Sequence, residues 1–135
     1  LKKAQQLGFR TIVIGDQSGS LSEQLNEPVE LLIEASGAPP ALAAAGQAVM
    51  AGGLIGVVAT YTGSVALPAT DLVRAEQRLH MSFGASRNDF DRAIAHIENG
   101  DIPVDDLVDT YALEHAIEAF DDSIAKSTQK AILIP

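Results

Sequence analysis

The sequence predicts an α/β fold: a doubly wound, mostly parallel sheet with helices on both faces. Two observations favour it. Short apolar segments alternate with helical segments along the 135 residues. The strand segments are continuously apolar rather than alternating between apolar and polar, which is typical of parallel strands covered on both faces.

The strands are predicted from short runs of branched apolar residues that are bounded by glycine or polar residues. Such runs occur at residues 11–16, 29–35, 53–60, 79–85 and 130–135.

The helices are predicted from caps, apolar spacing and stop signals. Ser20 and Glu23 have the spacing of a capping box, and Ser86 opens a segment whose apolar residues share one helical face. Helices are expected at residues 1–8, 20–26, 39–51, 68–76, 86–99 and 113–126. Residues 1–8 read like a helix entered partway along.

The composition excludes several classes of function. The net charge is −9, with 18 acidic against 9 basic residues, and such a surface repels nucleic acid and anionic lipid. Apolar stretches are interrupted well short of a membrane-spanning length. Cysteine is absent, which favours a reducing, cytoplasmic setting and excludes thiolate metal ligands.

The residues that follow the strands are the candidates for a site, because ligands bind outside the carboxyl ends of parallel strands. Small or hydroxylated residues dominate there, at 36–38, 59–61 and 82–84, and Asp16 ends the first strand. A row of small residues leaves a crevice that a flat ligand can fill. An acid at the position of Asp16 can accept hydrogen bonds from a ribose diol, although it is also a common turn residue.

Catalytic side chains are not evident. The three histidines have no metal-ligand spacing, and the acidic pairs at 105–106 and 121–122 are typical of solvated helix faces. Neither a Gly-x-Ser-x-Gly elbow nor a Gly-x-x-x-x-Gly-Lys loop occurs. The catalytic residues are therefore unknown, and no metal site is predicted.

A series of motifs resembles a known family. "IEASGAPPAL", "AGGLIGVVATY", "DFDRAIAHIENGDI", "LEHAIEAF" and "KAILIP" follow one another in this order. They resemble the Rossmann-like coenzyme-binding domain of the medium-chain, zinc-containing alcohol dehydrogenases, a family that includes polyol, sugar and threonine dehydrogenases. "AQQLGFRTIVIGD" resembles the helix and strand before them.

The resemblance implies a role for each matching residue. Asp16 would bind the adenosine ribose and favour NAD over NADP. Lys130 would reach the pyrophosphate. The adenosine side of the groove would be lined by Ala35, Ser36, Gly37 and Ala38, and the nicotinamide side by Val58, Ala59, Thr60, Ser82 and Phe83. Met81 replaces the glycine that the family carries at that position.

Relative to the family, the domain is expected to be incomplete. The glycine-rich fingerprint and its strand would precede residue 1, and residues 16–29 are too few for the third strand and helix. We therefore expect residues 1–135 to be a single, partial dinucleotide-binding domain, inactive alone and without the catalytic domain. In a second interpretation, residues 11–25 are themselves a first strand, a glycine loop and a helix.

The resemblance implies an NAD-dependent oxidoreductase that moves hydride between nicotinamide and an alcohol or polyol. Zinc would belong to the parent enzyme, with ligands outside this chain. A homodimer or homotetramer would use the edge strand at 79–85. The alternatives are a zinc-free quinone oxidoreductase of the same superfamily and a minimal, non-enzymatic nucleotide-binding or interaction domain.

Overall fold

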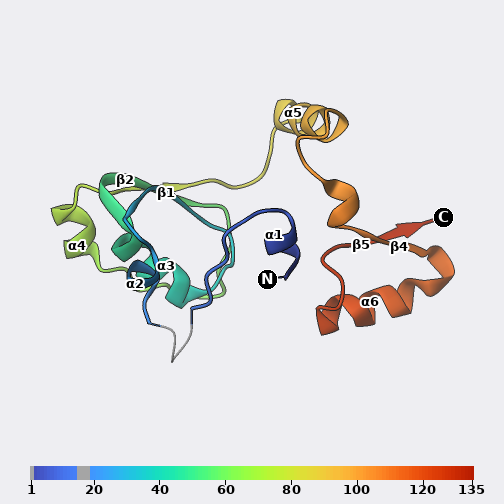
Figure 1. Cartoon of the computed structure of the whole chain (residues 1–135), viewed down its shortest axis with the longest axis horizontal. Coiled ribbons are helices and arrows are strands. Elements are labelled where there is room, and N and C mark those ends of the chain that lie inside the picture. The colour runs from blue at the N-terminus through green and yellow to red at the C-terminus, as the bar shows by residue number, and fades with distance from the viewer. Residues whose placement is uncertain (1, 15–18) are drawn as a thin grey trace. The chain divides into compact units, whose positions relative to one another are not determined.

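The chain folds into two compact units, Leu1–Gly84 and Ala85–Pro135 (Figure 1). The structure is a computed structural model that describes residues 2–14 and 19–135. Each unit contains a parallel sheet with helices around it, which confirms the predicted α/β class. That residues 1–135 serve as one dinucleotide-binding domain stays a prediction.

The sheet of the first unit consists of β1 (Val29–Glu34), β2 (Val49–Val57) and β3 (Arg78–Met81) in that spatial order. All neighbouring strands are parallel. The helices α3 (Pro39–Ala48) and α4 (Ala69–Arg74) lie in the two connections between them. The register pairs Glu34 with Val57 and Val57 with Met81, so the three strands end at the same level.

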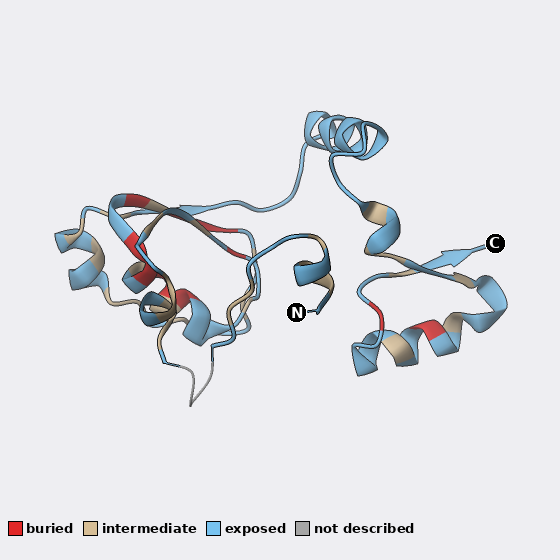
Figure 2. Ribbon diagram, in the orientation of Figure 1, coloured by how far each residue is buried: buried red, intermediate tan, exposed pale blue. Residues whose placement is uncertain are grey.

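The core of this unit lies between α3 and the sheet (Figure 2). Pro39 and Pro40 open α3, where missing N–H groups cost nothing, and alanines give the helix a narrow inner face. That face buries Leu42, Ala45 and Ala48 against apolar residues of the sheet. The buried cluster comprises Leu42, Ala45, Val49, Ile55 and Val57.

An irregularity marks the start of β2, which begins at Val49 rather than at the predicted residue 53. Val29 pairs with Val49, but Leu31 already pairs with Leu54, so the intervening residues of β2 bulge outward. The Gln77 side-chain amide holds the junction by donating to the carbonyl oxygens of Gly46 and Val49, at 2.9 and 2.6 Å. The bulge explains why the helix ends earlier than its sequence suggested.

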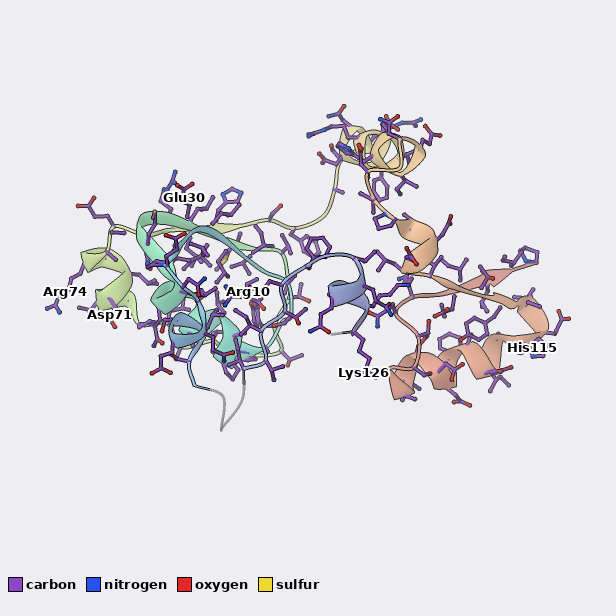
Figure 3. All side chains as sticks on the ribbon, in the orientation of Figure 1. Arg10, Glu30, Asp71, Arg74, His115 and Lys126 are labelled. Carbon is purple, nitrogen blue, oxygen red and sulfur yellow. The ribbon has the colours of Figure 1, made fainter. Side chains whose placement is uncertain are left out.

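The N-terminal segment contains α1 (Lys2–Gln6) and α2 (Leu21–Gln24). The capping box of Ser20 and Glu23 is confirmed. The strand predicted at 11–16 is wrong over its described residues 11–14, which pair with no strand. Side chains hold this segment instead: Arg10, labelled in Figure 3, donates to the Gln24 carbonyl at 2.7 Å, and Gln24 donates to the Val13 carbonyl at 2.8 Å.

The second unit contains α5 (Arg87–Glu98), β4 (Asp109–Ala112), α6 (Ala116–Ala125) and β5 (Ala131–Ile134). Single 3₁₀ turns occupy Val104–Asp106 and Leu113–His115. The strands β4 and β5 are parallel, and α6 packs against both. Strand β4 was not predicted, because its sequence "DTYA" lacks an apolar run.

Much of the apolar surface of the helices in this unit is exposed (Figure 2). Ile117 and Phe120 of α6 are 80 % and 67 % exposed, whereas Ala119 is buried. Phe90 and Ile94 of α5 are also exposed. Within the described residues, no helix is long and apolar enough to cross a membrane.

Candidate functional site

The carboxyl ends of β1, β2 and β3 bring most of the predicted site residues to one edge of the first sheet. The backbone ladder extends past the strands, because the Val58 N–H donates to the Glu34 carbonyl at 3.0 Å and the Ser82 N–H donates to the Val57 carbonyl at 2.9 Å. The segments 35–38, 58–61 and 82–83 therefore follow three adjacent strands that end level with one another.

Two of these segments touch at Gly37 and Thr60. Gly37 has a φ of +69°, which only glycine adopts without strain. A methyl group on Gly37 would lie 2.8 Å from the Thr60 carbonyl oxygen, closer than real contacts allow. Glycine is therefore required here both by its backbone conformation and by the close approach of the neighbouring loop.

Two hollows lie along this edge. The larger, of about 640 Å³, is lined by residues of α2, β1 and α3 and includes Ala35, Ser36 and Ala38. The smaller, of about 390 Å³, includes Ala59, Ser82 and Phe83, together with Tyr61 and Met81. Three of the four residues assigned to the adenosine side thus border one hollow, and three of the five assigned to the nicotinamide side border the other. Gly37, Val58 and Thr60 border neither of the two.

A buried carboxylate that the sequence analysis did not single out lies beneath both loops. Glu34, the last residue of β1, is only 4 % exposed. Its Oε1 accepts hydrogen bonds from the Ser36 hydroxyl and, at 2.8 Å, from the Ser36 N–H. Its Oε2 accepts from the Tyr61 hydroxyl. The single carboxylate therefore binds groups from the loop after β1 and from the loop after β2.

These contacts set the protonation states of the pair. Burial alone would raise the pKa of Glu34, but the hydrogen bonds from Ser36, Tyr61 and the Gly37 N–H outweigh it and lower the pKa below its ordinary value. Burial and the hydrogen bond to the Glu34 carboxylate raise the pKa of Tyr61 to about 12. At neutral pH, Glu34 is therefore an acceptor and Tyr61 a donor.

The Ser36 hydroxyl extends this arrangement to α3. It accepts a hydrogen bond of 3.1 Å from the N–H of Ala38, the residue that precedes the helix. The next two residues, Pro39 and Pro40, have no N–H groups. Ser36 thus connects the Glu34 carboxylate to the start of the helix that covers the sheet.

Two of the predicted site residues are not placed in this group. Asp16 lies outside the described residues. Lys130 lies in the second unit, where it is exposed and directly precedes β5. The roles of both residues stay predictions.

The described residues contain no group of three or more His, Cys, Asp or Glu side chains that could hold a metal ion. Two of the three histidines form surface pairs with carboxylates: His96 with Asp101 at 2.9 Å and His115 with Glu118 at 3.1 Å.

No protein-family model matches the sequence, and neither does any curated protein. Solved structures are similar in fold. One is 2R,3R-butanediol dehydrogenase from Bacillus subtilis, with a TM-score of 0.81 and 24 % identity over 99 % of this chain and 40 % of that one. A second is an E. coli CFT073 protein described as a short chain alcohol dehydrogenase complexed with NADH, with a TM-score of 0.82 and 18 % identity over 98 % and 40 % of the two chains.

A third is a zinc-binding dehydrogenase from Sinorhizobium meliloti 1021 bound to NADP, with a TM-score of 0.71 and 22 % identity over 80 % of this chain and 32 % of that one. The chain thus spans about one third to two fifths of the length of these structures. It has the fold of a portion of these Rossmann-like dehydrogenases, which confirms at the level of fold the resemblance inferred from the sequence motifs.

Proposed function

We propose that the chain is the coenzyme-binding part of an NAD-dependent oxidoreductase that transfers hydride between nicotinamide and an alcohol or polyol. The observation that carries the proposal is the carboxyl edge of the first sheet, where small residues border two hollows on neighbouring strands. This is where open parallel sheets bind nucleotides. Similar solved structures hold NADH or NADP, which supports a nicotinamide dinucleotide as the ligand.

The residues present fit such a ligand. Ala35, Ser36 and Ala38 leave the larger hollow open for an adenosine, since none has a bulky side chain. Ala59 and Ser82 do the same for a nicotinamide in the smaller hollow, with Phe83 as an apolar wall. The bound dinucleotide supplies the hydride chemistry. The chain's own residues bind its two halves, orient them and exclude water.

The choice of NAD over NADP rests on Asp16. Its carboxylate would accept hydrogen bonds from the 2′-hydroxyl of the ribose and repel a 2′-phosphate. Similar folds bind either cofactor, so this residue and not the fold carries the preference.

The remaining features of the parent protein are proposed on the same basis. It would act on a small alcohol or polyol with zinc, whose ligands lie outside this chain. It would be a cytoplasmic homodimer or homotetramer, without nucleic-acid or membrane partners. The position of β3 supports the assembly: among the described residues it is an outer strand of its sheet, and an outer strand offers N–H and C=O groups to a second copy.

Cofactor titration of the full-length protein tests the proposal. NADH should bind more tightly than NADPH, and Asp16→Ser should reduce that preference by about 1 to 3 kcal/mol, the range for a hydrogen bond to a charged group. Asp71→Ser is the matched control, because Asp71 is an exposed aspartate on α4 (Figure 3). Absence of NADH and NADPH binding refutes the function, whereas an unchanged preference in Asp16→Ser refutes only the role of that residue.

A further inference from the structure

We propose that Glu34 is a positioning residue whose carboxylate anchors both ligand-binding loops of the site. Ser36 and Tyr61, which supply the hydrogen-bond donors, are positioning residues with it. The inference rests on the proposed function and extends it. It assigns the geometry of the site to a buried residue that borders the larger hollow and is tied to the smaller one through its hydrogen bond with Tyr61.

The position of Glu34 supports this assignment. It is the last residue of β1, and its partner in the register is Val57, the last residue of β2. The two loops that follow these residues begin side by side. A carboxylate at this point can reach donors on either loop, and it has one oxygen for each.

Each of the two carboxylate oxygens of Glu34 binds a different loop, and this distinguishes Glu34 from an ordinary buried acid. Oε1 serves the first loop through Ser36, and Oε2 serves the second loop through Tyr61. All these partners are hydroxyl or backbone N–H groups. The carboxylate therefore neutralises no cation in this arrangement, but holds two segments that carry opposite halves of the proposed site.

Removal of one donor leaves a buried carboxylate oxygen without its partner, and water cannot readily replace it. The effect is local, because only the loop that carried the donor is released. Without the Tyr61 hydroxyl, the loop at 58–61 keeps its contact at Gly37 but loses its hydrogen bond to the anchor. The loop at 35–38 keeps its bonds to Oε1. Tyr61→Phe should therefore loosen the nicotinamide half and leave the adenosine half intact.

Ser36→Ala should act on the other half. It removes the hydroxyl that donates to Glu34 and accepts from the Ala38 N–H, so the loop at 35–38 loses two contacts. Glu34→Gln should disturb both loops, since the neutral amide keeps only one acceptor oxygen and lacks the charge that strengthens the hydrogen bonds to both.

The test is binding of NADH and of AMP to the full-length protein, with AMP as the probe of the adenosine half. Tyr61→Phe should raise the Kd for NADH by about tenfold, roughly 1.4 kcal/mol, and change the Kd for AMP less than about twofold. Ser36→Ala and Glu34→Gln should weaken both ligands. The ratio of the NADH affinity to the AMP affinity is the decisive readout, because a general destabilisation of the protein would weaken the binding of both ligands alike.

Tyr111→Phe is the matched control. The Tyr111 hydroxyl also donates to a carboxylate, that of Asp122 at 2.9 Å, but Tyr111 belongs to the second unit and lines neither hollow. This variant should lose a comparable hydrogen bond and leave both affinities unchanged.

Amide hydrogen exchange in the absence of ligand separates the inference from the proposed function. Tyr61→Phe should speed exchange in the loop at 58–61 and not in the loop at 35–38. If the wild type binds neither NADH nor AMP, the proposed function is refuted and the exchange rates still decide whether the anchor exists. Unchanged exchange, or an equal loss of NADH and AMP affinity in Tyr61→Phe, overturns the inference.

Discussion

Replacement of Gly37 by alanine should be among the most costly single-methyl additions in the first unit. Two separate penalties meet at this residue. A left-handed backbone costs a residue with a Cβ about 1 to 2 kcal/mol. The new methyl would also lie 2.8 Å from the Thr60 carbonyl oxygen, and a backbone atom cannot rotate away as a side chain can. Overpacking of this kind costs about 1 to 3 kcal/mol, so the total is about 2 to 5 kcal/mol.

Gly52→Ala isolates the first penalty. Gly52 has a φ of +72°, close to that of Gly37, but nothing lies within 4 Å of the position its Cβ would take. Urea unfolding of the full-length variants, followed by circular dichroism, should show a loss of about 1 to 2 kcal/mol for Gly52→Ala and a further 1 to 3 kcal/mol for Gly37→Ala. Equal losses would show that the two loops do not meet as described.

Three further outcomes are expected. The Glu34–Tyr61 hydrogen bond should contribute constant stability between about pH 6 and 9. The pKa of the Glu34 carboxyl is lowered in the folded protein, so the contribution is lost as the pH falls through that pKa, below the ordinary 4.5. The pKa of the Tyr61 phenol is raised, so the contribution is also lost as the pH rises through about 12. The difference in unfolding free energy between wild type and Tyr61→Phe, measured against pH, checks this. Leu79→Pro should dissociate a dimer paired through β3 yet leave the fold intact, whereas His80→Pro should destabilise the sheet. The reason is that N–H groups alternate in direction along a strand: the Ser82 N–H faces β2, so that of His80 does too and that of Leu79 faces away. Light scattering and thermal unfolding distinguish the two variants. An intact dimer in Leu79→Pro would exclude this edge as the dimer contact. Gln77→Leu should cost about 1 to 3 kcal/mol by removing the donor for Gly46 and Val49; an unchanged urea midpoint would contradict that role.

Local signals in the sequence predicted local structure well. Ser20 with Glu23 forms the capping box that its spacing indicates, and Ser86 caps the helix that it was expected to open. The small residues after the strands do gather at one edge of the sheet, because parallel strands with helical connections leave no other arrangement.

The features that the sequence did not reveal depend on contacts between distant residues. Glu34 and Tyr61 are 27 positions apart, and a glutamate at the end of an apolar strand gives no sign that it will be buried. The bulge at the start of β2 depends on pairing with β1. The segment at 11–14 has the composition of a strand, but a strand requires a hydrogen-bonded neighbouring strand. Here the Val13 carbonyl accepts from the side chain of Gln24 instead.

The central position of β2 has a consequence for how the first unit folds. Pairing with β1 closes loops of about 20 to 23 residues, as from Val29 to Val49, and pairing with β3 closes loops of about 24, as from Leu54 to Arg78. Their entropic costs are nearly equal, since loop-closure entropy grows only with the logarithm of length. Neither outer strand has another partner among the described residues. A defect in β2 therefore blocks both closures and slows the whole unit, whereas a defect in either outer strand leaves the other pair free to form.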